Sequence, residues 1–323
     1  MTKPTKIAVV GAGKWGQNLI KTLSDLKVLT AIVEIDELRG QSLAKSYGVA
    51  YYSNLQQGLD HVDAVVIATP VPTHYELTKQ VLLAGKDVFV EKPLAMSVAE
   101  ADSLLTLACQ QQAILMVGHL LLYQPCIQFI KAFLASGQLG KVYSFRQTRR
   151  NLGTIRREEN VLYSLGVHDL AVLQHLIAEP VSAVLASSQT IITEGIADDM
   201  TIHLHYSSGV QAHLHLSWLW PVKDRQLMIL GEKGALHFDE LAGEVTYYQH
   251  YGNSDSSITK KGVEVLFSDS TPPLALELLH FLKCIQTREQ PLSSGQQGKE
   301  VVELMEKIMK VKAYAYDDPV YSS

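Results

Sequence analysis

A glycine-rich turn is the feature that most constrains what this chain can fold into. Residues 11–16 read Gly-Ala-Gly-Lys-Trp-Gly, between the apolar run at 7–10 and a helical pattern of leucine and isoleucine at positions 19, 20 and 23. A G-x-G-x-x-G spacing between a strand and a helix is typical of dinucleotide-binding folds. The first glycine would permit the tight turn, the second would let the backbone approach a pyrophosphate, and the third would allow close contact between helix and strand. Unpaired amides at the helix start would attract the phosphates. The residues that we expect to contact a dinucleotide here are Gly11, Gly13, Lys14, Trp15 and Gly16.

The pattern along the chain predicts two domains of the α/β class. Short β-branched runs alternate with helical stretches through about residue 118, which predicts a parallel sheet with crossover helices. Period-two runs between 142 and 249, with a helix over 162–178, predict a second domain with an open, largely antiparallel sheet. A length of 323 residues also exceeds what one core usually supports. We therefore expect an N-terminal Rossmann dinucleotide-binding domain over 1–120 and a C-terminal α/β domain over 121–323. The expected strands of the first domain are 7–10, 29–34, 64–68, 87–91 and 114–117.

Composition and charge exclude several kinds of partner. The formal net charge of -5 argues against a nucleic-acid partner, and no apolar run reaches the length that a membrane span needs. The first residues lead straight into the first expected strand, which leaves no room for a signal peptide, so we expect a cytoplasmic protein. The three cysteines, Cys109, Cys126 and Cys284, are far apart, and we expect reduced core thiols.

Acidic residues after the second expected strand indicate which dinucleotide is bound. Glu34 stands where a carboxylate can accept hydrogen bonds from the adenosine ribose and would repel a 2′-phosphate. Asp36 and Glu37 add negative charge, which favours NAD over NADP, although the nearby Arg39 leaves NADP open. The alternative is that Glu34 is a solvated strand end.

The loop after the strand at 64–68 lies at the carboxyl edge of the expected sheet, where open α/β sheets bind ligands. Thr69 and Pro70 would line the path of the cofactor. His74 is ambiguous, and we interpret it as a histidine that is satisfied locally.

A lysine follows the strand at 87–91, in the run Val-Glu-Lys-Pro. The ammonium of Lys92 would lie near the nicotinamide, where partial burial and the positive ring would lower its pKa. It could then bind or deprotonate a substrate hydroxyl, with Glu91 and Lys92 both beside the cofactor. The alternative is a solvated surface lysine, and Pro93, which restricts the backbone, weighs against it.

A histidine in the second domain is the other candidate for proton transfer. Histidine ordinarily titrates near neutrality, so His168 could take a proton from a hydroxyl and return it. Ser164 precedes it by one helical turn and would face the same way. The alternative is a packed histidine in an apolar helix.

Arginines gather between residues 146 and 157, around Asn151. Guanidinium groups bind phosphate through paired hydrogen bonds, so this segment suits a phosphorylated or nucleotide-linked substrate. The alternative is a solvated loop whose charges pair with Glu158 and Glu159. The arginines are Arg146, Arg149, Arg150, Arg156 and Arg157.

Four histidines alternate with apolar residues about the turn at 207–209, and strand pairing there would place them on one face. We favour a polar sheet face or a subunit contact over a metal site, because zinc sites need convergent geometry, and we expect no metal. The four are His203, His205, His213 and His215.

With these motifs in order, the chain resembles the Gfo/Idh/MocA oxidoreductases, the glucose-fructose oxidoreductase and inositol dehydrogenase family, over nearly its whole length. The resemblance implies a Rossmann domain that binds the nicotinamide cofactor and a C-terminal domain that supplies substrate and subunit contacts, hence a homodimer or homotetramer. Lys92 matches the catalytic lysine of the family and His168 its catalytic histidine. Many members have an aspartate where this chain has Ser164, and a serine cannot hold an imidazolium by charge.

Within the family, residues 118–125 and 149–160 resemble the branch that acts on UDP-linked amino sugars. This implies NAD-dependent oxidation of the 3-hydroxyl of UDP-N-acetylglucosamine or its uronic acid, with the arginine segment holding the diphosphate. Two alternatives stay open: an inositol or free-sugar dehydrogenase, and a regulator that binds NAD(H) without catalysis. The expected substrate-binding residues are Lys92, Tyr123, Arg149, Asn151, Arg156, Arg157, Ser164 and His168.

Overall fold

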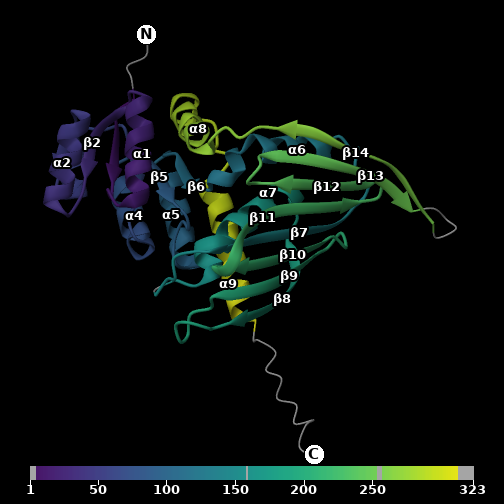
Figure 1. The fold of residues 1–323 in the computed structure, drawn as a ribbon. Helices are drawn as coiled ribbons and strands as arrows, with labels where there is room; N and C mark the ends of the chain where they lie inside the picture. The colour runs from purple at the N-terminus through teal and green to yellow at the C-terminus, as the bar shows by residue number, and fades with distance from the viewer. Residues whose placement is uncertain (1–4, 158, 253–256, 312–323) are drawn as a thin grey trace, which may run out of the picture. The chain divides into compact units, whose positions relative to one another are not determined.

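A computed structural model describes residues 5–157, 159–252 and 257–311 (Figure 1). The chain divides into two compact units: one contains Met1–Gln124 and Pro272–Glu303, and the other contains Pro125–Thr271 and Leu304–Ser323. The domain limits 1–120 and 121–323 stay a prediction, because a division by contacts does not show which segment folds on its own.

The first unit is built on a six-stranded parallel sheet in the order β3-β2-β1-β4-β5-β6, drawn in purple to blue in Figure 1. Its central strands are rich in β-branched and other apolar residues that are buried on both faces, as is typical of parallel sheets, and β5 has acidic residues only at its two ends. The five expected strands are confirmed, whereas the three-residue β3 was not expected. The strands are β1 Ile7–Val10, β2 Leu29–Val33, β3 Ala50–Tyr52, β4 Ala64–Ile67, β5 Asp87–Glu91 and β6 Leu115–Gly118.

Helices complete this unit, and polar side chains cap three of them. Asp36, Asn54 and Ser97 each accept a hydrogen bond from a backbone amide three residues later, which fixes where those helices begin. Short 3-10 turns cover Val71–Thr73 and Leu120–Tyr123. The helices are α1 Lys14–Asp25, α2 Glu37–Tyr47, α3 Leu55–Leu59, α4 His74–Leu83, α5 Val98–Gln110 and α8 Pro273–Thr287.

The second unit is built on an eight-stranded sheet in the order β14-β13-β12-β11-β7-β10-β9-β8. Only the β7–β10 pair is parallel among the described strands of this sheet, so the predicted fold class is confirmed. The strands are β7 Val142–Leu152, β8 Val181–Gln189, β9 Asp199–Tyr206, β10 Gln211–Ser217, β11 Leu219–Gly231, β12 Gly234–Asp239, β13 Glu244–Gly252 and β14 Ile258–Ser268.

The helices of the second unit include α6 Pro125–Ala135, which packs on β13 and β14, and α7 Val167–Ile177. The helix expected over 162–178 begins differently, with a π-helical turn over Leu162–Gly166 before α7. The last helix, α9 Gly295–Lys310, contains the boundary between the two units.

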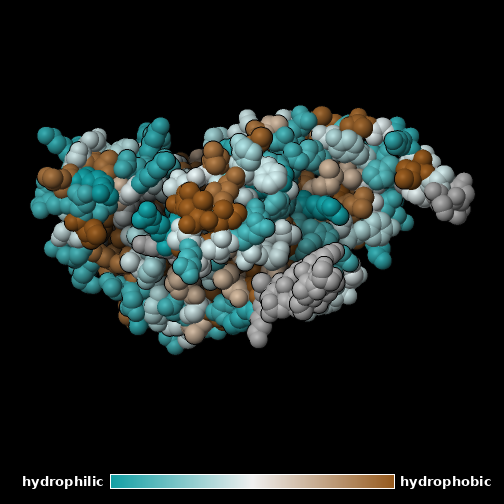
Figure 2. All heavy atoms as spheres, turned by 60° about the horizontal axis from the view of Figure 1, so that its bottom comes forward, coloured by the Kyte–Doolittle hydropathy of each residue, from teal (hydrophilic) through white to brown (hydrophobic). Residues whose placement is uncertain are grey.

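The cysteines and the membrane-span expectation can also be compared with the structure. Cys126 and Cys284 are buried thiols, but Cys109 is exposed on α5, so the expectation of a core thiol is wrong there. Among the described residues, no helix is long and apolar enough to cross a membrane. On the face drawn in Figure 2, hydrophobic residues form separate patches among hydrophilic ones.

Candidate active site

The turn between β1 and α1 needs glycine at two positions. Gly11 has a φ of 91°, and a Cβ there would lie 2.6 Å from the carbonyl oxygen of Ala68. A Cβ on Gly16 would lie 2.0 Å from the carbonyl oxygen of Gly11, so helix α1 approaches the strand as closely as we predicted. A Cβ on Gly13 would meet no atom within 4 Å among the described residues. Open space beside the first amides of α1 is what a bound diphosphate requires.

Glu34 is held beside this turn. Its carboxylate accepts hydrogen bonds from the backbone amides of Ala12 at 2.7 Å and Asp36 at 3.0 Å. The residue is only 6% exposed, so it is not a solvated strand end. Arg39 pairs with Asp36 at 2.6 Å and lies 3.7 Å from Glu34. The negative charge of Glu34 is therefore fixed at the end of β2, where a ribose would lie in a dinucleotide-binding fold.

Glu91 connects the glycine turn to the candidate catalytic lysine. The indole N–H of Trp15 donates to Glu91 Oε1 at 2.5 Å, and the backbone amide of Lys92 donates to Glu91 Oε2 at 3.3 Å. Burial raises the pKa of Glu91 to about 7, although Trp15 and Lys92 act in the opposite direction. Lys92 is itself partly buried. This burial weighs against a fully solvated surface lysine.

His74 braces the two loops that border this region. Its Nδ1 lies 2.8 Å from the carbonyl oxygen of Pro93, and its Nε2 lies 2.9 Å from that of Thr69. The side chain is 1% exposed, and burial lowers its pKa. The interpretation of His74 as a locally satisfied histidine is confirmed. It ties the loop of Thr69 and Pro70 to the loop that carries Lys92.

Two buried polar side chains in the first unit were not singled out from the sequence. His119, after β6, is 1% exposed, and burial together with Lys92 lowers its pKa to about 3. Glu277, on α8, is 0% exposed, and burial together with Glu91 raises its pKa well above 4.5. Neither side chain has a hydrogen-bond partner within the part of the chain that the structure describes. The sequence could have indicated Glu277 as a buried acidic residue, since it stands within an apolar helical pattern.

Tyr123 has a clear structural contact. Its hydroxyl lies 2.8 Å from Ser293 Oγ and accepts a hydrogen bond from the Ser293 amide at 3.2 Å. The ring is 7% exposed, and burial raises the pKa of the hydroxyl above its usual range. These bonds join the turn before α6 to the segment before α9. Its contact with a substrate stays a prediction.

Ser164 and His168 lie at the start of the long helix of the second unit. Ser164 is in the π-helical turn and is 8% exposed, whereas His168 is in the first turn of α7 and is partly buried. That the two side chains face the same way stays a prediction.

The arginines of the segment at 146–157 have different environments. Arg149 is 5% exposed and binds Asp169 and Glu240. Arg150 pairs with Asp224 and stacks on Trp220, with the guanidinium carbon 4.3 Å from the ring centre.

The arginines that follow β7 are open to solvent. Arg156 and Arg157 are exposed, and Arg156 pairs with Glu159 at 3.1 Å, as the solvated-loop alternative predicted. The other predicted partner, Glu158, lies outside the described residues. Asn151, at the end of β7, has a buried amide oxygen without a partner among the described residues. Exposed guanidinium groups remain suited to an anionic ligand.

The four histidines share one face of the sheet, as we expected. His203 lies opposite His213 in the β9–β10 pair, and their Nδ1 atoms are 2.6 Å apart. His215 lies 3.2 Å from Asp199. Within the described ranges, no group of three or more His, Cys, Asp or Glu side chains is arranged to hold a metal ion.

The glycine turn, the doubly wound parallel sheet and the lysine after β5 define a dinucleotide-binding protein whose second unit carries a large open sheet. Comparison with protein families agrees with this description. The model described as "Oxidoreductase family, NAD-binding Rossmann fold" matches residues 5–119, and the GFO/IDH/MocA C-terminal domain matches residues 127–237. The chain belongs to the GFO/IDH/MocA oxidoreductases.

Relatives in this family act on different substrates. UDP-N-acetylglucosamine 3-dehydrogenase of Acidithiobacillus ferrooxidans is 24% identical over 298 residues, which cover 92% of this chain and 94% of that protein. A solved structure of that enzyme matches with a TM-score of 0.87 at 22% identity and covers 95% of this chain and 97% of that chain. Myo-inositol 2-dehydrogenase of Thermotoga maritima is 26% identical over 311 residues, 91% of this chain and 92% of that protein. GenD2 from gentamicin A biosynthesis, solved with NAD, matches with a TM-score of 0.83 at 23% identity, covering 96% and 95%.

Proposed function

We propose that the protein oxidises the C3 hydroxyl of a UDP-linked N-acetylamino sugar, UDP-N-acetylglucosamine or its uronic acid, to the 3-keto sugar with NAD. The observation that carries this proposal is the partly buried Lys92 at the end of β5, joined through Glu91 to the glycine turn. The similarity to UDP-N-acetylglucosamine 3-dehydrogenase supports the substrate class.

The residues of the first unit suit a nicotinamide dinucleotide. The open space at Gly13, beside the first amides of α1, suits its diphosphate, and the fixed carboxylate of Glu34 suits a ribose with two hydroxyls. The same carboxylate would repel the 2′-phosphate of NADP, so we infer a preference for NAD. Lys14, Trp15, Thr69, Pro70, Glu91 and Lys92 complete the proposed cofactor contacts.

Two side chains divide the proton chemistry. When bound, NAD accepts the hydride that leaves C3. His168 takes the hydroxyl proton, which contributes roughly 100-fold or more to the rate, and the ammonium of Lys92 stabilises the developing alkoxide through charge. The reverse assignment, with Lys92 as base and His168 as stabiliser, uses the same two residues.

The exposed arginines at the end of β7 are suited to the diphosphate of the sugar nucleotide. Arg156 and Arg157 can form paired hydrogen bonds to phosphate oxygens, and the amide oxygen of Asn151 can accept from a sugar hydroxyl. Arg149 stays a predicted substrate contact, but its present bonds to two carboxylates would first have to break. Tyr123 and Ser164 complete the proposed set. We also infer a cytoplasmic homodimer or homotetramer, since the family uses its exposed sheet for subunit contacts.

Substitution of each proton-handling residue tests the proposal. Lys92→Ala and His168→Asn should each lower kcat roughly 100-fold or more, because each removes a group that acts in the transition state. In His168→Asn, the affinity for NADH, measured by fluorescence titration, should change little. This measurement controls for loss of cofactor binding. Near-full turnover in either variant contradicts the scheme.

A second candidate is an inositol or free-sugar dehydrogenase, which is favoured by the 26% identity to myo-inositol 2-dehydrogenase. NADH formation should be measured with UDP-N-acetylglucosamine, its uronic acid and myo-inositol in parallel. Turnover of the unphosphorylated polyol alone selects this candidate. Tight NADH binding without turnover of any of the three selects the non-catalytic regulator.

A further inference from the structure

We propose that Arg149, Asp169 and Glu240 form a buried clamp that fixes the first turn of α7 and thereby positions His168. The inference rests on the proposed function for its effect on catalysis, and on the contacts of the second unit alone for the clamp itself. In this arrangement Asp169, on α7, is the positioning residue, Arg149 holds its carboxylate, and Glu240 balances the charge of Arg149. Arg149 could contact a substrate only after these bonds break.

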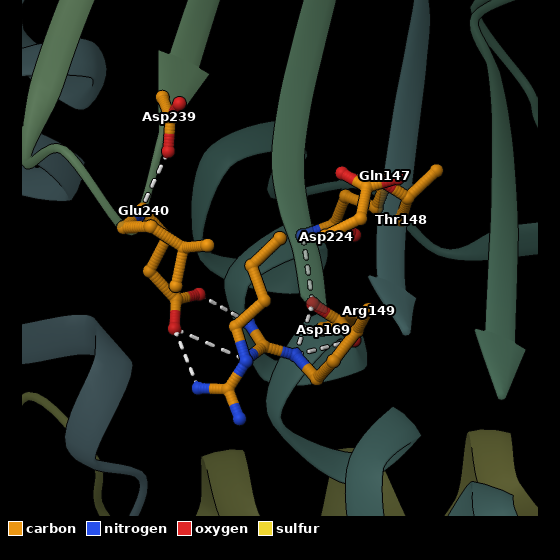
Figure 3. Close-up of polar contacts among 9 residues, drawn as sticks. Gln147, Thr148, Arg149, Asp169, Asp224, Asp239 and Glu240 are labelled. Atoms are coloured by element: carbon orange, nitrogen blue, oxygen red, sulfur yellow. Dashed lines mark hydrogen bonds and ion pairs between the residues drawn. The ribbon is translucent and has the colours of Figure 1, made fainter. Parts of the chain in front are cut away.

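Arg149, on β7, lies between the carboxylate of Asp169, on α7, and that of Glu240, directly after β12 (Figure 3). Its Nε donates to Asp169 Oδ1 at 3.0 Å and Oδ2 at 2.9 Å. Its Nη1 and Nη2 donate to Glu240 Oε1 at 3.2 Å and Oε2 at 2.6 Å. All three guanidinium nitrogens are therefore engaged within the protein.

The clamp is electrically balanced and closed to solvent at its centre. Arg225, on β11, donates to Glu240 Oε1 at 3.0 Å, so two cations face two carboxylates. Arg149 is 5% exposed and Asp169 is 1% exposed. Burial alone would lower the pKa of Arg149, but Asp169 and Glu240 raise it above its usual value. The guanidinium is therefore held in place, because its departure would leave the buried carboxylate of Asp169 without its ion-pair partner.

Asp169 is the link to His168. The two residues are adjacent in the first turn of α7, so a bond that holds Asp169 also sets the rotation of the helix start about its axis. The helical segment that leads into α7 begins at Asn160, whose side-chain oxygen accepts hydrogen bonds from the amides of Leu162 at 3.1 Å and Tyr163 at 3.2 Å. The Arg149–Asp169 bond adds a second anchor after the π-helical turn, next to His168. Lys131 holds the other end of α7 through the carbonyl oxygen of His175 at 2.5 Å.

A small rotation of α7 would be enough to affect catalysis. Helices with side chains have a radius of about 5 to 6 Å, so a rotation of about 10° moves a side-chain tip by about 1 Å. A displacement of about 1 Å at a reacting group can lower the rate by about 100-fold. Loss of the Arg149–Asp169 bond is therefore expected to change kcat more than cofactor affinity.

Two carboxylate variants separate positioning from general stability. Asp169→Asn and Glu240→Gln each remove one negative charge from the same clamp, but only Asp169 belongs to α7. We expect both variants to lower Tm, and we expect only Asp169→Asn to lower kcat by about 10- to 100-fold with the KM for NAD unchanged. In Asp169→Asn, two guanidinium groups face the single carboxylate of Glu240. The double variant Arg149→Met with Asp169→Asn removes the excess cation, so Tm should recover while kcat stays low.

A measurement without substrate keeps the clamp testable if the proposed activity fails. The ring proton signals of His168, assigned in NMR spectra by comparison with His168→Asn, report its environment in the resting protein. We expect one sharp set in the wild type and in Glu240→Gln, and shifted or broadened signals in Asp169→Asn. Unchanged His168 signals in Asp169→Asn, or equal perturbation in both carboxylate variants, would overturn the clamp. Absence of turnover of any sugar with the expected NMR pattern would overturn only the proposed function.

Discussion

Glu277 offers a test of the buried electrostatics around the candidate site. Its carboxyl group is fully buried on α8 and has no hydrogen-bond partner among the described residues. Burial, and then the nearby Glu91, raises its pKa well above 4.5, so the folded protein holds a proton that the unfolded chain releases. Glu277→Gln removes the titration but keeps a buried polar group. Glu277→Met removes both.

The sign of the effect follows from the raised pKa. Stability from the bound proton is fully present below pH 4.5 and is lost as the pH rises through the raised pKa of the folded protein. Within that window the wild type loses about 1.4 kcal/mol of unfolding free energy per pH unit, and the Gln variant does not. From pH 5 to pH 8, the Gln variant should therefore gain stability relative to the wild type, by no more than about 1.4 kcal/mol for each pH unit. The Met variant should exceed the Gln variant by about 1 to 3 kcal/mol, because it buries no unpaired polar group.

Urea unfolding at pH 5, 6, 7 and 8, followed by circular dichroism, measures these differences. Hydrogen exchange of peptides from β5 and α8 shows whether the change lies in the first unit. Glu91, whose pKa burial raises to about 7, also titrates in this pH range, so the pH dependence of each variant is compared with that of the wild type.

Two outcomes would refute this reasoning. The first is the same pH dependence in the Gln variant and the wild type, which would mean that Glu277 does not change its protonation on unfolding. The second is a Met variant that is the least stable of the three at pH 8, which would mean that the carboxyl group makes a favourable interaction at that pH.

The remaining predictions concern the cofactor. Gly16→Ala should lower both Tm and NADH affinity, since its Cβ would lie 2.0 Å from a backbone oxygen. In Gly13→Ala the new Cβ would meet no atom of the described residues within 4 Å, so this variant should weaken NADH binding with Tm unchanged. Equal Tm values for the two variants would contradict this. Glu34→Gln keeps an acceptor for the Ala12 amide but loses the charge, so the ratio of NADPH to NADH affinity should rise about tenfold by fluorescence titration. An unchanged ratio would mean that Glu34 does not select the cofactor.

Local pattern was sufficient to predict most of the first unit. Short, mostly apolar runs mark β1, β2, β4, β5 and β6, because strands that are buried on both faces leave little room for polar residues. The three-residue strand β3 escaped prediction, since it is short and only partly buried at the edge of the sheet. The return of residues 272–303 to the first unit was also not predicted, because period and composition do not show which unit a helix packs against.

Predictions about the candidate site depended on residue type and position in the sequence, which do not show which residues form hydrogen bonds with each other. The sequence could identify Lys92 from its place after a strand and Glu34 from its place near the glycine turn. It could not show that His74 bonds to two carbonyl oxygens, or that Trp15 bonds to Glu91. These contacts join segments far apart in the sequence.

In the arginine segment, the alternation of buried and exposed positions along β7 is a further pattern that distinguishes the arginines. On β7 the buried positions are Phe145, Gln147 and Arg149, which alternate with positions that are more exposed. Arg149 therefore has the parity of a core residue, whereas Arg156 and Arg157 lie beyond the strand. A buried guanidinium needs carboxylate partners, because an unpaired charge in the interior is costly. Strand parity thus separates an arginine that organises the second unit from arginines that remain available to a substrate, and it does so before any partner is known.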